Sequence, residues 1–275
     1  MISTFNILTD VTDTAECSLF IEISGHGISY WALTPDNACF ALSVYHFSAV
    51  TTNDQAADYF KKIVNEQHLL GQLFKNIYII YTFSEALLVP SRFVNKDATT
   101  EMLNMVYGED SESIPRSDLV HQLNLQNIYR VPKPVEEVVT SQYPNATHWH
   151  LYSILSGANK STGNQLYCIF NTNHLMVQLI KNGQLQIIQQ FEYKSPEDAA
   201  YFILSVCQQF EATLNDTEVV LNGMIDEESA LYKELRKYLL QIRFSTLPET
   251  FTYDEGIKHY ASHYFSHLFE IAACV

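Results

Sequence analysis

Three histidines near the carboxyl end of the chain have the spacing of a metal site. His259, His263 and His267 recur every four residues, so on a helix they would lie along one face. Two histidines one turn apart can bind Zn²⁺ or Ni²⁺. The same spacing also fits a polar stripe beside the apolar one that contains Leu268 and Ile271. No second cluster with metal-ligand spacing occurs in the sequence, so we expect no bound metal and leave the role of these histidines open.

Two other patterns contain residue types used in catalysis, at spacings that do not fit it. Residues 156–164, SGANKSTGN, contain Gly, Lys, Ser and Thr, but a P-loop requires a glycine directly before the lysine, where Asn159 stands. No G-x-S-x-G nucleophile motif occurs in the sequence. We therefore interpret 156–164 as part of a linker.

The composition predicts a well-packed protein of a reducing compartment. Of 275 residues, 47% are hydrophobic and 13% aromatic, which is enough for a large core. The formal charge of −15 disfavours nucleic acid and anionic membrane surfaces as partners. The five cysteines are widely spaced and form no C-x-x-C. Since no signal peptide or apolar run of about 20 residues is present, we expect a cytoplasmic protein without membrane insertion.

The first half of the chain contains a recognisable series of elements. Residues 18–47 hold three apolar runs separated by turns, which predicts an antiparallel meander. Asn53 or Asp54 can cap a following helix at about 55–70. The run NIYIIYT at 76–82 is apolar from 77 to 81 without alternation, as expected for a strand buried on both faces.

The second half repeats this order. Residues 166–192 again contain three strands, and Asn182-Gly183 is a strong hairpin signal. Ser195 followed by Pro196 predicts the start of a helix that runs to about 213. A short apolar strand follows at 218–222.

The two halves also share sequence. QAADYFKKIV in the first predicted helix aligns with EDAAYFILSV in the second, which pairs Ala57 with Ala199. The strand residues 77–81 pair with 218–222 at an offset that is one residue smaller. This agreement over two elements predicts an internal duplication.

Both halves continue with a helix, a strand and a second helix, at 97–107, 126–132 and 133–143, and at 228–240, 241–248 and 257–273. The predicted order is β-β-β-α-β-α-β-α in each half, which makes a mixed five-stranded sheet with helices on its faces. We expect lobes at residues 1–150 and 165–275, joined by a linker at 151–164. The preceding stretch 147–155 fits either a strand or a helix.

A duplicated unit of this order resembles the actin-like ATPase superfamily, whose two lobes are ribonuclease H-like. The length, the element order and the closing HYFSHLFEIAAC also resemble an uncharacterised Bacteroidetes family, a domain of unknown function with an actin-like ATPase fold. The resemblance implies an α/β protein of two duplicated ribonuclease H-like lobes.

The superfamily resemblance implies three nucleotide loops, and all three depart from the pattern in this chain. The first phosphate loop corresponds to Ser24-Gly25-His26-Gly27, without the carboxylate that holds Mg²⁺ through water, because Glu22 lies inside the strand. The second corresponds to Asn171-Thr172-Asn173, which has neither aspartate nor glycine. The adenosine loop corresponds to Asn222-Gly223-Met224-Ile225, where one glycine of a Gly-Gly step remains.

We therefore expect degenerate nucleotide loops in the cleft between the lobes. The candidate cofactor-binding residues are Ser24, Gly25, His26, Asn171, Thr172, Asn173, Asn222 and Gly223. A strongly acidic protein without an evident lysine at these loops would bind Mg-ATP poorly, so we expect neither a cofactor nor catalysis.

By fold-level analogy, the resemblance implies a scaffold. Actin-like proteins of type IV pilus and type II secretion platforms, and of cell division, are cytoplasmic scaffolds for membrane-anchored partners. We expect a non-catalytic scaffold or protein-interaction module with a protein partner in such an assembly. The alternative is a divergent nucleotide-binding ATPase or small-molecule kinase.

Overall fold

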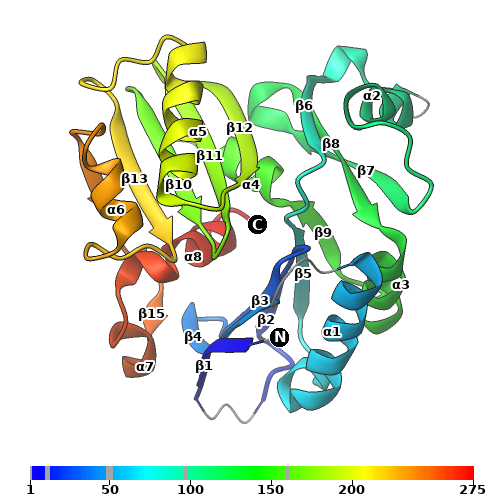
Figure 1. Cartoon of the computed structure of the whole chain (residues 1–275). Helices are drawn as coiled ribbons and strands as arrows, with labels where there is room; N and C mark the ends of the chain where they lie inside the picture. Colours follow the sequence, from blue (N-terminus) through cyan, green and yellow to red (C-terminus); the bar gives the residue numbers. More distant parts are fainter. Residues whose placement is uncertain (1, 10–12, 48–51, 96–97, 159–160) are drawn as a thin grey trace. The chain divides into compact units, whose positions relative to one another are not determined.

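The computed structural model describes the chain except for residues 1, 10–12, 48–51, 96–97 and 159–160. It consists of two compact units (Figure 1). Unit 1 comprises residues 1–157, 250–257 and 274–275, and unit 2 comprises 158–249 and 258–273. No helix in the described ranges is long and apolar enough to cross a membrane.

Unit 1 contains a mixed sheet in the order β1-β4-β3-β2-β5-β9, with β15 paired to β4. Its strands are β1 (Ile2–Leu8), β2 (Ser18–Ile23), β3 (Gly27–Leu33), β4 (Ala38–His46), β5 (Asn76–Tyr81), β9 (Thr147–His150) and β15 (Thr252–Tyr253). The meander β2-β3-β4 is antiparallel, while β5 and β9 run parallel to β2. The predicted meander and buried strand are confirmed, and β1 and β15 extend the sheet.

The fifth strand of this sheet differs from the prediction. Residues 126–132 do form a strand, β8 (Leu125–Pro132), but it pairs with β6 (Ala86–Pro90) and β7 (Ser113–Val120) in a separate three-stranded sheet. β9 takes the predicted place beside β5. A local apolar pattern predicts a strand without identifying its partner, which explains the error.

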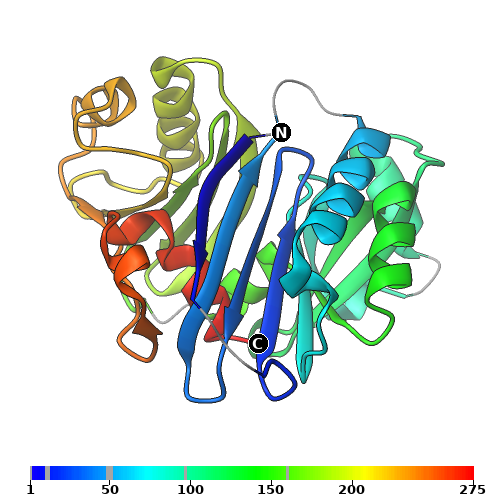
Figure 2. The same cartoon turned by 90° about the horizontal axis from the view of Figure 1, so that it is seen from below.

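Helices α1 (Asn53–Glu66) and α3 (Lys133–Gln142) pack together on one face of the larger sheet (Figure 2). Thr52 caps α1 through a capping box with Gln55, in place of the predicted Asn53 or Asp54. The Tyr143 hydroxyl donates to the Leu70 carbonyl oxygen at 3.0 Å, which ties the end of α3 to the segment after α1.

Unit 1 also contains α2 (Ala98–Tyr107) and α4 (Leu151–Ala158). α4 occupies the first part of the stretch 151–164 that was predicted as a linker, and six of its residues are buried. The stretch 147–155, whose sequence fits either a strand or a helix, is a strand to His150 and a helix from Leu151. Apolar or aromatic side chains at Leu151, Tyr152, Ile154 and Leu155 favour the burial of α4.

Unit 2 contains a five-stranded mixed sheet in the order β12-β11-β10-β13-β14, as predicted. Its strands are β10 (Gln165–Phe170), β11 (His174–Lys181), β12 (Gln184–Glu192), β13 (Glu218–Gly223) and β14 (Ile242–Phe244). Asn182 and Gly183 form the predicted hairpin turn, with φ values of 53° and 74°. Ser195 caps α5 (Pro196–Gln209) through a capping box with Asp198.

Both faces of the unit 2 sheet are covered. α5 lies over one face of the sheet (Figure 1). Leu166, Cys168 and Phe170 of β10 belong to the same hydrophobic core as the buried residues of α5. The intervening Tyr167 faces the opposite side, where its hydroxyl donates to Glu270 of α8 (Ser266–Ala272). α6 (Ala230–Leu235) covers part of the predicted helix 228–240.

The chain after β14 differs from the predicted single helix at 257–273. It forms three short pieces, α7 (Glu255–Lys258), a 3-10 turn at Ser262–Tyr264 and α8. Further 3-10 turns lie at His68–Gly71, Ser91–Phe93 and His121–Leu123. Tyr, His and Ser are modest helix formers, and buried contacts of His263 and Ser266 hold residues 258–273 against the rest of unit 2 instead.

The two sheets share strand order and direction, because β4-β3-β2-β5-β9 corresponds to β12-β11-β10-β13-β14. The equivalence is shifted by one residue from the sequence alignment. When Ala56 corresponds to Ala199, the capping box and every buried position of α1 match those of α5. In the strands, Asn76 corresponds to Glu218, since each pairs with the first residue of the neighbouring meander strand.

Replacing Gly223 is expected to destabilise unit 2 strongly. Gly223 has φ of 78°, and a Cβ there would lie 2.2 Å from the carbonyl oxygen of Phe170. Gly183 has a similar φ of 74°, but its Cβ would meet nothing closer than 3.4 Å. We predict that Gly223→Ala lowers the free energy of unfolding by about 2–4 kcal/mol, and Gly183→Ala by about 1 kcal/mol, as measured by urea unfolding. An equal loss of stability in the two variants would contradict the special steric role of Gly223.

Candidate functional site

The first predicted phosphate turn is closed by its own hydrogen bonds. Ser24 Oγ accepts from the backbone N–H groups of His26 at 3.1 Å and of Gly27 at 3.0 Å. The Ser24 hydroxyl donates to the Gly27 carbonyl oxygen at 3.1 Å. Gly25 has open space around it, whereas a Cβ on Gly27 would lie 2.5 Å from the Tyr45 carbonyl oxygen. The glycine at 27 is thus required by packing against β4.

Glu22 is the carboxylate closest in sequence to this turn. It lies inside β2, as predicted, and Thr82 Oγ1, just after β5, donates to its Oε1 at 3.0 Å. Burial raises the pKa of Glu22 to about 7, although the hydrogen bond from Thr82 lowers it. The half-buried side chain therefore gives up its proton only near neutral pH.

The second predicted phosphate turn lies at the carboxyl end of β10 in unit 2. The Asn171 N–H donates to the His174 carbonyl oxygen at 2.8 Å, which closes the turn. The Tyr193 hydroxyl donates to the Asn171 carbonyl oxygen at 2.8 Å, and the Tyr193 N–H donates to that of Asn173 at 2.9 Å. Thr172 is exposed at the tip. The turn is held by the end of β12 and presents no carboxylate.

Asn222 and Gly223 lie at the end of β13, next to this second turn, because Phe170 pairs with Gly223 in the parallel register. Asn222 is fully buried, and its Oδ1 accepts from the Ser266 hydroxyl at 2.6 Å. The side chain thereby anchors α8 to the sheet. The structure brings Asn171-Thr172-Asn173 and Asn222-Gly223 to one sheet edge, whereas Ser24-Gly25-His26 belongs to unit 1.

A buried polar network in unit 1 had no recognisable sequence signal. The Tyr81 hydroxyl donates to Glu136 Oε2 at 2.7 Å, and Glu136 also forms an ion pair with Arg116. His148 Nδ1 lies 3.1 Å from the Tyr81 oxygen, so the Nδ1–H tautomer donates to it. Burial and the charge on Glu136 raise the pKa of Tyr81. This network links β5, β7, β9 and α3.

A second group surrounds Asp118 of β7. Its carboxylate accepts from the Tyr129 hydroxyl at 3.0 Å, and from the His150 N–H and the Ser153 hydroxyl, both at 2.7 Å. Burial raises the pKa of Asp118 even though these donors lower it. The partners come from distant segments, so only predicted contacts of β7 with β8, β9 and α4 could have revealed them. Because its oxygens are engaged internally, we interpret the group as a structural anchor.

The three histidines do not share a helix face. His259 is exposed, His263 donates from Nε2 to the Ile225 carbonyl oxygen at 2.7 Å, and His267 is buried in α8. Burial lowers the pKa of His267 to about 4. Among the described residues, no group of three or more His, Cys, Asp or Glu side chains could hold a metal ion.

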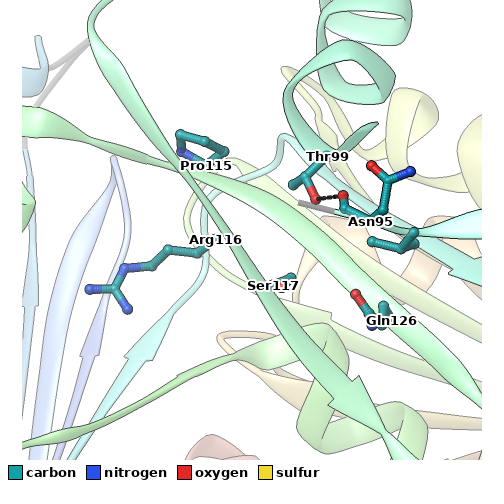
Figure 3. Close-up of a pocket in the computed structure, with 7 residues that line it drawn as sticks. Asn95, Thr99, Pro115, Arg116, Ser117 and Gln126 are labelled. Atoms are coloured by element: carbon teal, nitrogen blue, oxygen red, sulfur yellow. Dashed lines mark hydrogen bonds between the residues drawn. The ribbon is translucent and has the colours of Figure 1, made fainter. Parts of the chain in front are cut away.

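A pocket of about 320 Å³ lies beside α2 in unit 1. Its lining consists of Val94, Asn95, Thr99, Pro115, Arg116, Ser117 and Gln126. Figure 3 shows that the guanidinium of Arg116 points away from Thr99 and Asn95. None of the predicted site residues lines this pocket, and its other polar groups are amides and hydroxyls.

Solved structures with similar folds agree with this architecture. A Bacteroides thetaiotaomicron VPI-5482 protein with an actin-like ATPase fold and unknown function is 18% identical, with a TM-score of 0.78 over 98% of this chain and 100% of that chain. The PilM–PilN type IV pilus biogenesis complex is 11% identical, with a TM-score of 0.57 over 93% of this chain and 97% of that chain. The ethanolamine utilization protein EutJ from Carboxydothermus hydrogenoformans is 10% identical, with a TM-score of 0.55 over 98% of this chain and 93% of that chain.

These similarities establish the actin-like ATPase fold and confirm the resemblance drawn from the sequence. No curated protein sequence matches this chain. Residues 7–242 match the family described as "Protein of unknown function (DUF3822)". The chain is therefore a member of the DUF3822 family, with an actin-like ATPase fold.

Proposed function

We propose that this chain is a non-catalytic, cytoplasmic actin-like scaffold or protein-interaction module. The observation that carries the proposal is the closure of the first turn. The N–H groups of His26 and Gly27, which a phosphate would need as donors, are used by the Ser24 hydroxyl. Opening them to a phosphate would cost two internal hydrogen bonds.

The second turn supports the same conclusion. Its backbone carbonyls at Asn171 and Asn173 accept from Tyr193, and its residues supply neither a metal carboxylate nor a lysine. Gly223 is required for the close approach of Phe170, so its presence has a structural reason independent of a nucleotide base. The remaining resemblance to an adenosine loop is therefore weak evidence for nucleotide binding.

A scaffold role also fits the charge and the similar folds. Mg-ATP is anionic, and a protein with a formal charge of −15 repels it at long range. PilM, at a TM-score of 0.57, belongs to a type IV pilus biogenesis complex with PilN. By this analogy, we propose that the chain binds a protein partner in a membrane-anchored assembly.

The alternative is a divergent nucleotide-binding ATPase or small-molecule kinase, and Glu22 favours it. Its carboxylate stands two residues before the first turn, and its pKa of about 7 leaves part of the population ionised in the cell. Mg²⁺ prefers carboxylate oxygen, so bound Mg²⁺ would draw Glu22 into its ionised form. A test must therefore separate the two functions directly.

We predict that Mg-ATP does not raise the melting temperature of the protein. A ligand at about 100 times its Kd would stabilise the fold by about 2.7 kcal/mol, which thermal-shift titration detects easily. A saturable rise that is lost in both Glu22→Gln and Thr172→Trp would overturn the scaffold proposal. Thr172 is exposed, so its replacement leaves the fold intact.

We also predict that Glu22 makes stability depend on pH. Its pKa is about 7 in the folded chain against an ordinary 4.5, so the folded state favours the neutral carboxyl group. The stability that the neutral Glu22 contributes is fully present below about pH 4.5 and is lost as the pH rises through 7. Glu22→Gln keeps an acceptor for Thr82 and removes this titration. At pH 8 its free energy of unfolding should therefore exceed that of the wild type by up to about 3 kcal/mol.

Urea unfolding of the wild type and Glu22→Gln at pH 5 and pH 8 measures this effect. Asp54→Asn serves as the control, because Asp54 is exposed in the first turn of α1. Identical pH dependence in the wild type and Glu22→Gln would show that Glu22 is ionised in the folded protein across this range. That result would strengthen the nucleotide-binding alternative.

A further inference from the structure

The outer side of α2 exposes a cluster of apolar side chains. Met105 is 83% exposed and Val106 is 57% exposed, while Thr99 and Leu103 of the same helix are buried. Met102, Met105 and Val106 are spaced i, i+3 and i+4, so they share one side of the helix, which we call the α2 stripe. Apolar side chains gathered in this way mark interaction surfaces more often than isolated ones do.

Four acidic residues flank the α2 stripe in the sequence, and we call them the acidic rim. Glu101 precedes it, and Glu109, Asp110 and Glu112 follow it, all exposed. Residues 98–112 contain no Lys, Arg or His, so the segment carries a charge of −4. A hydrogen bond from Ser113, with help from Arg130 and Lys133, lowers the pKa of Asp110 and keeps it ionised.

The framework beneath the stripe is held firmly. Arg130 is only 5% exposed, and its guanidinium donates to Asn104 Oδ1 and to the Gly108 carbonyl oxygen, both at 2.6 Å. The same group pairs with Glu85 at 2.7 Å. The Tyr107 hydroxyl donates to the Ala86 carbonyl oxygen at 2.9 Å. Because α2 and the start of the acidic loop are already ordered, a partner would not have to order them on binding.

We propose that the α2 stripe and its acidic rim dock a basic amphipathic helix of a protein partner. This inference rests on the proposed function as an interaction module and names its surface and the chemistry of its partner. The apolar side of such a helix would cover Met105 and Val106, and its Lys or Arg side chains would pair with the rim. A second copy of the chain fits poorly, because it would bring the same acidic rim and a further charge of −15.

The stripe is tested with a fluorescent synthetic peptide, an amphipathic helix of leucine and lysine, titrated against the full chain by anisotropy. We expect saturable binding that weakens at least about tenfold in Met105→Asp/Val106→Asp. The matched control is Leu73→Asp, because Leu73 is 82% exposed in unit 1 but lies outside α2. Its binding should equal that of the wild type. Thermal unfolding confirms that each variant is folded.

The rim is tested separately by neutralising carboxylates. Glu109→Gln/Asp110→Asn should weaken binding several-fold and reduce its dependence on salt. Glu227→Gln/Glu228→Gln removes the same charge from an exposed site in unit 2 and should leave binding unchanged. A leucine–glutamate peptide of the same length should not bind.

Several results would overturn the docking surface. These are unchanged binding in Met105→Asp/Val106→Asp, an equal loss in either control, or equal binding of the leucine–glutamate peptide. A dimer in light scattering that Met105→Asp/Val106→Asp dissociates would assign the stripe to a second copy instead. Failure of the peptide experiment leaves the Mg-ATP result untouched. A saturable stabilisation by Mg-ATP that is lost in both Glu22→Gln and Thr172→Trp would overturn the scaffold proposal whichever way the peptide behaves.

Discussion

The parallel pairing between the first meander strand and the strand that follows the helix is the constraint on which both units depend. In unit 1 it joins β2 to β5 from Ser18 and Asn76 onward, and in unit 2 it joins β10 to β13 from Gln165 and Glu218 onward. Parallel strands end at the same sheet edge, so this pairing determines which turns can become neighbours. It brings Thr82 to Glu22, and Gly223 to Phe170.

At these strand ends, polar groups are used to hold the fold. Ser24 satisfies the backbone of its own turn, Asn222 anchors α8 through Ser266, and Tyr193 closes the turn after β10. A phosphate site needs backbone donors that remain open until the ligand arrives. The same architecture can therefore be stable without a ligand when its own side chains satisfy the backbone groups of the turns, and this is the physical basis of the scaffold proposal.

Local signals in the sequence predicted the elements whose determinants are adjacent in the chain. The Asn182-Gly183 hairpin and the Ser195 cap are examples, because one turn or one capping residue decides them. Contacts between distant residues could not be predicted in this way. Glu22 and Thr82 are 60 positions apart, and the strand at 126–132 carried no signal for the sheet that it joins. The single helix expected at 257–273 failed because tertiary contacts of His263 and Ser266 outweigh helical periodicity.

The three-stranded sheet with α2 is the clearest difference between the two units, since the described part of unit 2 has no counterpart to it. Its inner face holds Asp118 in a buried hydrogen-bonded group, while Arg130 fixes α2 on the outer face. Met105 and Val106 are exposed together beside this rigid support, which distinguishes them from single exposed apolar side chains elsewhere. Firm attachment beneath and apolar exposure above are the properties expected of a surface that binds a partner without reorganising.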